Sequence, residues 1–128
     1  MTVIYTHIIF ALSAILLGLV VLVSPKGTNK HKSLGWVWVI CLMVVSLSAV
    51  FIQEIKPGQF SPIHLLVPFT LVSLVYAILS IRKFKQTGRR GYKVAHIASM
   101  VAVYIGGPLV AGAFALMPGR FLYQVLFQ

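Results

Sequence analysis

Four long runs of apolar residues, separated by short polar connectors, make up most of the chain. They cover residues 3–23, 34–52, 62–81 and 94–117. Each run approaches or exceeds the roughly 20 residues that an α-helix needs to cross the hydrocarbon core of a bilayer. None of them alternates polar and apolar positions as a half-buried strand does. The pattern therefore predicts an all-α integral membrane protein with one domain, residues 1–128, folded as an up-down-up-down four-helix bundle.

Composition excludes the common soluble classes. Of the 128 residues, 59% are hydrophobic and only 9% are charged, whereas about 25% are charged in a typical soluble domain. Eleven Lys and Arg stand against a single acid, Glu54, which lies at the edge of a span. The basic residues occupy short stretches between apolar runs, so we expect no nucleic-acid binding. Because no ionisable carboxylate, Lys or Arg lies deep within a span, an ion-coupled carrier is also disfavoured.

The distribution of basic residues predicts how the chain sits in the membrane. The connectors 24–33 and 82–93 hold nine of the eleven Lys and Arg, and the opposite side holds only Lys56 and Arg120. Positively charged connectors stay in the cytoplasm. We therefore expect these two connectors in the cytoplasm and both termini outside, in a multi-pass protein of the bacterial inner membrane.

Each predicted helix carries one histidine near its amino end: His7, His31, His64 and His96. Because neighbouring helices run in opposite directions, these residues fall into two layers. His7 and His64 lie on the outer side, and His31 and His96 lie on the cytoplasmic side, about 20 Å away by the helix rise. A single metal ion cannot hold all four, since metal–nitrogen bonds are about 2 Å long.

Two histidines at one depth on different helices suit the two faces of one haem. Helix bundles commonly build cofactor sites from side chains on facing helices. We therefore expect two b-type haems, with His7 and His64 as ligands of the outer iron and His31 and His96 as ligands of the inner one. Lys56 and Arg120 are candidates to pair with the outer propionates. Candidates for the inner propionates are Lys26, Lys30, Arg89 and Arg90.

Small residues on the first and fourth spans suit either a flat macrocycle or close helix contact. They are Ala14, Gly18, Gly106, Gly107, Ala111 and Gly112. The aromatic residues Trp36 and Trp38 are expected at the cytoplasmic interface. Tyr76 and Tyr104 lie deeper and are expected to need an interhelical partner. Cys41 is expected to be inert packing, and Ser61 with Pro62 predicts a helix start.

Several segments, in order and spacing, are similar to a family of bacterial predicted membrane proteins known chiefly as a domain of unknown function. They are Lys26-Gly27-Thr28 with His31 and Gly35, then residues 60–66 (FSPIHLL), His96, residues 106–114 (GGPLVAGAF) and Pro118-Gly119-Arg120. The resemblance covers nearly the whole chain. It implies a four-helix membrane protein whose histidines belong to the shared pattern. The two-layer arrangement also resembles, in architecture alone, that of the di-haem cytochromes of the b561 type.

Three functions remain open from the sequence. The first is a small di-haem b protein that carries electrons across the membrane, with quinone as a candidate partner. The second is a non-catalytic accessory or assembly subunit of a membrane respiratory complex, in which case other subunits are the partners. The third and weakest is a transition-metal site built on one histidine pair, since two imidazoles leave the coordination of copper, zinc or iron incomplete. If the chain is redox-active, it is an electron carrier rather than a stand-alone catalyst.

Overall fold

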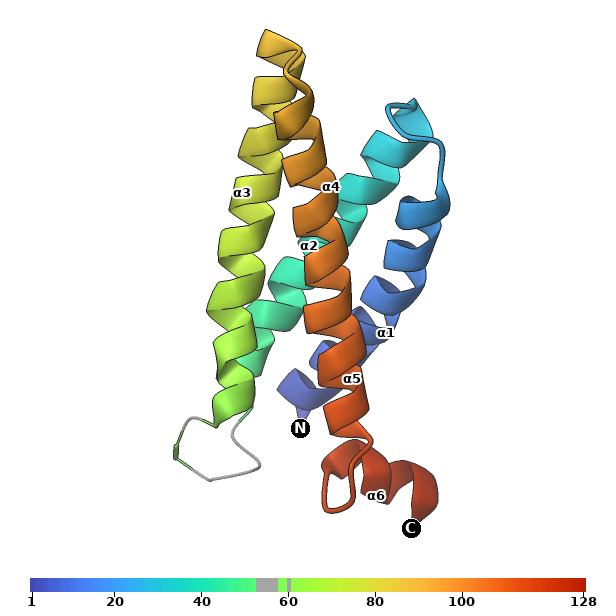
Figure 1. Ribbon diagram of the computed structural model, residues 1–128. Helices are drawn as coiled ribbons and strands as arrows, with labels where there is room; N and C mark the ends of the chain where they lie inside the picture. Colours follow the sequence, from blue (N-terminus) through green and yellow to red (C-terminus); the bar gives the residue numbers. More distant parts are fainter. Residues whose placement is uncertain (53–57, 60) are drawn as a thin grey trace.

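The computed structural model describes residues 1–52, 58–59 and 61–128, which form an all-α bundle (Figure 1). Four of its helical segments are long and apolar enough to cross a membrane. They are Thr2–Val23, Asn29–Val50, Pro62–Thr87 and Arg90–Ala115. These bounds confirm the predicted all-α fold with four spans, and they lengthen the second, third and fourth spans at the ends that carry basic residues.

Helices α1 (Thr2–Val23) and α2 (Asn29–Val50) form an antiparallel hairpin with a short turn at residues 24–28. The side-chain oxygen of Thr28 caps α2 by accepting a hydrogen bond from the backbone N–H of His31, at 3.2 Å. Asn29 therefore begins the helix, and the predicted connector 24–33 is half helix. His31 lies in the first turn of α2 rather than in a loop before it.

The second hairpin begins with the 3₁₀ segment η1 (Pro62–Leu65), which leads into α3 (Leu66–Thr87). Ser61 occupies the N-cap and Pro62 follows at the first position, as predicted. Gly88 ends α3 in a left-handed conformation, with φ at 69°, a position that favours glycine because it lacks a Cβ. Most of the basic connector predicted at 82–93 is therefore helical.

The last span is interrupted at its centre. Helix α4 (Arg90–Tyr104) passes into a π-helical turn, η2 (Ile105–Leu109), and continues as α5 (Val110–Ala115). Pro108 lies within this turn, and because proline has no N–H it cannot bond to the carbonyl four residues earlier. A short helix that the sequence did not predict, α6 (Phe121–Phe127), follows.

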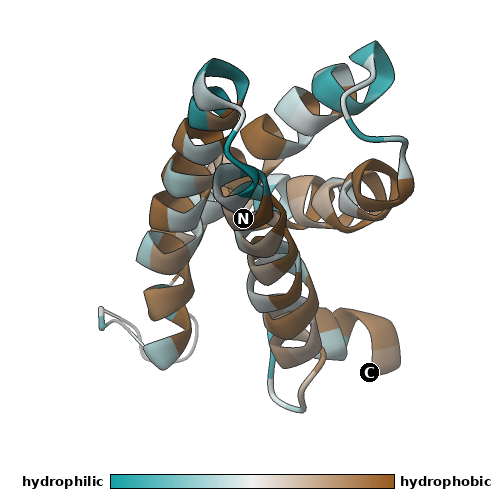
Figure 2. Cartoon of the chain, turned by 45° about the horizontal axis from the view of Figure 1, so that its top comes forward, coloured by the Kyte–Doolittle hydropathy of each residue, from teal (hydrophilic) through white to brown (hydrophobic). Residues whose placement is uncertain are grey.

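The two hairpins meet mainly at one end of the bundle. We call this end the terminal end, because both termini, α6 and the start of α3 lie there, and we call the opposite end, with turns 24–28 and 88–89, the tip end. In Figure 1 the α1–α2 and α3–α4 hairpins converge at the terminal end and spread apart toward their tips. Figure 2 shows hydrophilic residues gathered at the tips, while most of the helical surface is hydrophobic, as expected for a protein in contact with lipid.

The best-packed region lies midway along the bundle. Its largest fully buried side chains are Trp38, Leu42 and Val103. Trp38 is 0% exposed, whereas Trp36, two residues earlier, is 51% exposed. The prediction of an interfacial position is therefore wrong for Trp38, which turns inward from the face of α2 that packs on α1. Cys41 is buried and unpaired, in agreement with its expected packing role.

Candidate functional site

Two histidines tie α1 and α2 together at opposite ends. On α1, His7 Nδ1 lies 3.1 Å from the carbonyl oxygen of Val45. On α2, His31 Nδ1 lies 3.3 Å from the carbonyl oxygen of Val21. Fourteen residues separate His31 from Val45, and fourteen separate His7 from Val21. The two histidine positions are therefore about 21 Å apart along either helix, as the helix rise predicted.

A third interhelical bond lies halfway between these two. Trp38 donates its indole Nε1–H to the carbonyl oxygen of Ala14, at 2.9 Å. Trp38 is seven residues from both His31 and Val45, and Ala14 is seven from both His7 and Val21. Seven residues are close to two helical turns, so all three bonds lie on one face of each helix. We call these three bonds the α1–α2 ladder.

Tyr104 of α4 reaches the same level of the bundle. Its hydroxyl donates to the carbonyl oxygen of Ile15 at 3.0 Å, one residue beyond the acceptor used by Trp38. The two rings pack edge to face with centroids 6.0 Å apart. The expected interhelical partner of Tyr104 is thus confirmed. Tyr76 differs, because it is 56% exposed on the outer face of α3.

His64 occupies the connection into α3 and uses both ring nitrogens. Its Nδ1 accepts the backbone N–H of Ser61 at 3.1 Å, so Nε2 carries the proton. Nε2 then donates to the carbonyl oxygen of Ile52, also at 3.1 Å. His64 therefore caps the start of η1 and joins it to the end of α2.

His96 joins the two helices of the second hairpin. Its Nδ1 lies 2.9 Å from the carbonyl oxygen of Ala77 on α3. Lys26 lies beside His31, because its ammonium group donates to the same Val21 carbonyl that accepts from His31. His31 and His96 therefore lie toward the same end of the bundle but on different hairpins, which spread apart there (Figure 1).

His7 Nδ1 lies 3.1 Å from the Val45 carbonyl oxygen and 2.9 Å from the Ser48 hydroxyl, which can donate or accept, so these contacts do not fix its tautomer. The hydrogen bonds do fix the tautomers of His31 and His96, because a carbonyl oxygen only accepts and their Nδ1 atoms must donate. In a neutral ring, Nε2 is then the unprotonated nitrogen and carries a lone pair. Metal-binding histidines commonly show this arrangement, in which a carbonyl holds one ring nitrogen and orients the other toward the metal.

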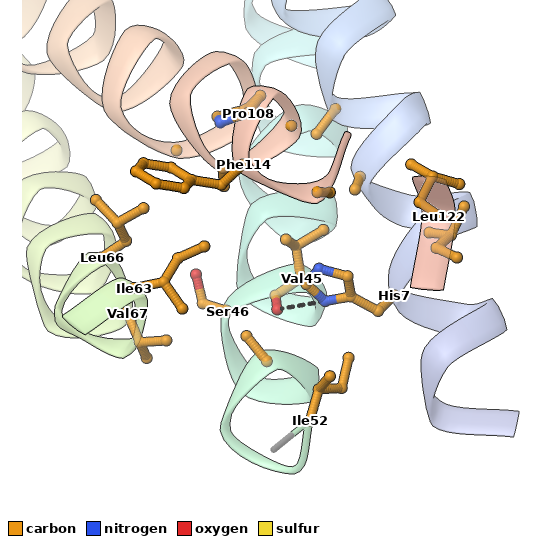
Figure 3. Close-up of a pocket in the computed structure, with 18 of the residues that line it drawn as sticks. His7, Val45, Ser46, Ile52, Ile63, Leu66, Val67, Pro108, Phe114 and Leu122 are labelled. Atoms are coloured by element: carbon orange, nitrogen blue, oxygen red, sulfur yellow. Dashed lines mark hydrogen bonds between the residues drawn. The ribbon is translucent and has the colours of Figure 1, made fainter. Parts of the chain in front are cut away.

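An apolar cavity with a volume of about 250 Å³ lies between the hairpins at the terminal end (Figure 3). Residues of α1, α2, η1, α3, η2, α5 and α6 line it, and most are aliphatic or small. Figure 3 shows His7 projecting from α1 across this region toward Val45. The polar or charged side chains that line the cavity belong to His7, Ser46, His64, Thr70 and Arg120.

The small residues singled out from the sequence divide into two groups. Four of them line the cavity: Ala14, Gly107, Ala111 and Gly112. The other two accept aromatic rings instead. Gly18 lies against Tyr104 and Trp38, and Gly106 lies against Phe69. One group of small residues therefore lines the cavity, and the other permits close packing of aromatic rings.

The two histidines of the terminal end share the cavity but bond at different depths. His7 bonds to Val45 and His64 bonds to Ile52, and these acceptors are seven residues apart, about 10 Å along a helix. Arg120 lies at the start of α6 and lines the same cavity as His7 and His64. Glu54 and Lys56, the other residues considered at this end, lie outside the described residues.

Sequence reasoning missed the role of Trp38 and the polar lining of the cavity. The sequence did carry a signal for Trp38, because Trp38 lies seven residues after His31 and therefore on the same face of the helix. Ser46 and Thr70 gave no such signal, since isolated hydroxyl residues are common in spans. Within residues 1–52, 58–59 and 61–128, no three His, Cys, Asp or Glu side chains gather as a metal-binding group.

Comparison with known proteins yields one match. Residues 4–124 match the family model described as "Predicted membrane protein (DUF2306)". Neither the curated proteins nor the solved structures include a match to the chain. The family match covers almost all of the spans, the four histidines and the cavity. The chain therefore belongs to the DUF2306 family of predicted membrane proteins.

Proposed function

We propose that this multi-pass membrane protein carries electrons between the two faces of a bacterial inner membrane, using b-type haem held by histidines of facing helices. The observation that carries the proposal is that His7, His31 and His96 each bring Nδ1 to a carbonyl oxygen of a neighbouring helix. His31 and His96 thereby donate Nδ1–H and keep Nε2 as a potential iron ligand, and His7 does the same when the Ser48 hydroxyl accepts from it. When bound, haem supplies the one-electron chemistry.

The tip end offers a candidate ligand pair. His31 and His96 come from helices of different hairpins and each has an oriented Nε2, but the hairpins spread apart there and would have to close around the haem. The spread of the two hairpins toward their tips lets them adjust around a flat group. Lys26, adjacent to His31, supplies a positive charge for a carboxylate substituent.

The terminal end fits in part. The cavity offers apolar walls, small residues and a cation, Arg120. Its volume of about 250 Å³ is slightly below the roughly 300–1,000 Å³ typical of small-molecule sites, so a macrocycle requires the cavity to widen. His64 must also break the bond between its Nε2 and the Ile52 carbonyl so that Nε2 can bind iron, and its ring must move to the depth of His7. Haem binding at this end is therefore coupled to rearrangement of η1.

The test is the visible spectrum of protein purified from haem-sufficient cells, oxidised and reduced, with haem quantified per chain. We expect a Soret band, a reduced α band and two haems. His96→Gly should remove the tip-end haem, and added imidazole should restore it, because the small ligand replaces the missing side chain. Tyr76→Phe, on the outer face of α3, is the matched control and should keep both haems. A folded, colourless wild-type protein would overturn the proposal.

A second function is favoured by a different reading of the same bonds. Each of the four histidines bonds to a backbone carbonyl of another element, and such bonds stabilise helix packing without any cofactor. On this reading the chain is an accessory subunit, and its large apolar surface packs on other membrane subunits. Co-purification of a colourless protein with a respiratory complex would favour it over the electron carrier.

A further inference from the structure

Two hydroxyl groups in the cavity at the terminal end have no hydrogen-bond partner. The side chains of Ser46 on α2 and Thr70 on α3 line this cavity, and the residues are only 5% and 4% exposed. Among residues 1–52, 58–59 and 61–128, neither hydroxyl bonds to another group. Every fully enclosed polar side-chain atom in these ranges has a partner, so the two hydroxyl oxygens must face the open space. Figure 3 shows Ser46 pointing from α2 into it.

Both hydroxyls lie at the depth of His7. The bond between His64 and the carbonyl of Ile52 sets the register of the third span against α2. Ser46 is six residues before Ile52, and Thr70 is six residues after His64, so each lies about 9 Å inward from that bond. His7 contacts the residue that precedes Ser46, and its Nε2 has no partner in the described part of the chain. Polar groups of three helices therefore meet the cavity at one level.

The size of the cavity suits one or two rings. In another protein, an apolar cavity of about 150 Å³ holds benzene, and this cavity measures about 250 Å³. A pair of fused rings with small substituents is therefore the right size without any widening of the bundle. The walls are aliphatic side chains and the small residues Gly107, Ala111 and Gly112. The cavity thus suits a flat, apolar group with few polar atoms.

We infer that this cavity binds the ring of a lipid-soluble quinone, with Ser46 and Thr70 as hydrogen-bond donors to the ring oxygens. A quinone ring is flat and apolar, its carbonyl oxygens accept hydrogen bonds, and it reaches the protein from the bilayer. His7 Nε2 lies at the same depth and is a further partner for a ring oxygen. The inference goes beyond the electron-carrier proposal and does not depend on haem, because the site needs neither iron nor any movement of His64.

A lipid acyl chain suits the same space less well. Arg120, at the start of α6, would pair with the acid group of such a lipid. The chain itself would then lie inside the cavity and leave the hydroxyls of Ser46 and Thr70 without partners. Because a buried polar group without a partner is costly, the two hydroxyls favour an occupant that carries oxygen atoms on its ring.

The test measures the binding of labelled 2,3-dimethyl-1,4-naphthoquinone to the protein in lipid vesicles, corrected for uptake by vesicles without protein. We expect saturable binding with one site per chain. Unlabelled 2,3-dimethylnaphthalene has the same rings without the oxygens, and it should compete at least about tenfold more weakly than the unlabelled quinone. Equal competition by the two compounds would overturn the inference, as would an absence of saturable binding or full displacement by an equal concentration of oleate.

The hydroxyls are tested by substitution. Ser46→Ala and Thr70→Val should each weaken binding by about fivefold, the contribution of one hydrogen bond. Ser80→Ala is the matched control, because Ser80 is 4% exposed on α3 but does not line the cavity, and it should bind as the wild type does. Circular dichroism checks that each variant is folded, and the comparison of the two ring compounds on the wild type decides if a variant is not.

The two proposals can fail separately. Equal affinities of Ser46→Ala, Thr70→Val and Ser80→Ala would overturn the quinone site. A haem-loaded protein that binds no quinone overturns this inference alone. A colourless protein that binds the quinone overturns the haem proposal alone.

Discussion

Gly18 and Tyr104 approach each other more closely than any residue with a side chain would allow. A Cβ at position 18 would lie 2.6 Å from two carbon atoms of the Tyr104 ring. The contact involves a buried ring that is also fixed by its bond to Ile15. The ring therefore has little room to move, and the position of α1 against α4 depends on this glycine.

Gly18→Ala should destabilise the protein by about 1–3 kcal/mol, the usual cost of overpacking a close contact. The free energy of unfolding in detergent is the quantity to measure. Gly35→Ala is the matched control, because Gly35 lies within α2 with nothing inside 4 Å of an added Cβ. It should be neutral or stabilising by up to about 1 kcal/mol, since alanine favours helix. Equal losses in both variants would contradict the close contact.

The hydroxyl of Tyr104 should contribute measurably to stability. Tyr104→Phe removes its bond to the Ile15 carbonyl but keeps the ring, and interhelical hydrogen bonds in membranes are worth about 0.6 kcal/mol on average. We expect a loss of about that size. Tyr76→Phe, at an exposed position, should leave the free energy of unfolding unchanged. A larger loss at Tyr76 than at Tyr104 would mean that the two side chains are placed differently.

The π-helical turn at η2 should depend on Pro108. With alanine there, the N–H at position 108 becomes available to the carbonyl of Tyr104, and the turn gains an ordinary helical bond. Loss of the extra residue in that turn would rotate α4 against α5 by about 100°. Tyr104 and the cavity-lining Gly107 could then no longer both face inward, so we expect destabilisation of about 1–3 kcal/mol.

The control for Pro108→Ala is Pro68→Ala. Pro68 is exposed in the first turn of α3, where the helix does not use its N–H. This variant should change the free energy of unfolding by no more than about 0.5 kcal/mol. The hydrogen–deuterium exchange of residues 104–112 should change only in the Pro108 variant. A neutral Pro108→Ala with unchanged exchange would mean that other contacts hold the π-helical turn.

The basic tips predict the orientation of the chain in the membrane, and labelling can measure that orientation directly. With Cys41 replaced by serine, a single cysteine is placed at Gln86 near the tip end or at Gln124 on α6. An impermeant thiol reagent added to intact cells should label the cysteine at position 124 and not the one at 86, because positive segments stay in the cytoplasm. The opposite pattern would reverse the predicted topology.

Helix number and the two histidine levels could be predicted because they depend on local signals. The four apolar runs have the length of a span, and the helix rise alone places His7 and His31 about 20 Å apart. The helix bounds were less accurate, because residues such as Lys30 and Lys83 fit a helix that extends beyond the hydrocarbon core. Only the N-cap bond of Thr28 shows where α2 begins.

The partners of the side chains could not be predicted, because they depend on how the helices pack. The sequence grouped Trp36 with Trp38, yet the helical repeat turns one outward and the other toward Ala14. The same holds for His64, whose bonds to Ser61 and Ile52 are set by the path of the chain into α3. Sequence spacing gives the level of a residue but not the direction of its side chain.

The even spacing of the α1–α2 ladder restricts how the protein can move. Sliding α1 along α2 by even one turn would break the bonds of His7, Trp38 and His31 at the same time. A piston-like displacement within this hairpin is therefore strongly disfavoured, and the two helices behave as one rigid arm. Larger relative motions of the helices are therefore expected between the two hairpins, which converge at the terminal end and spread apart at the tips.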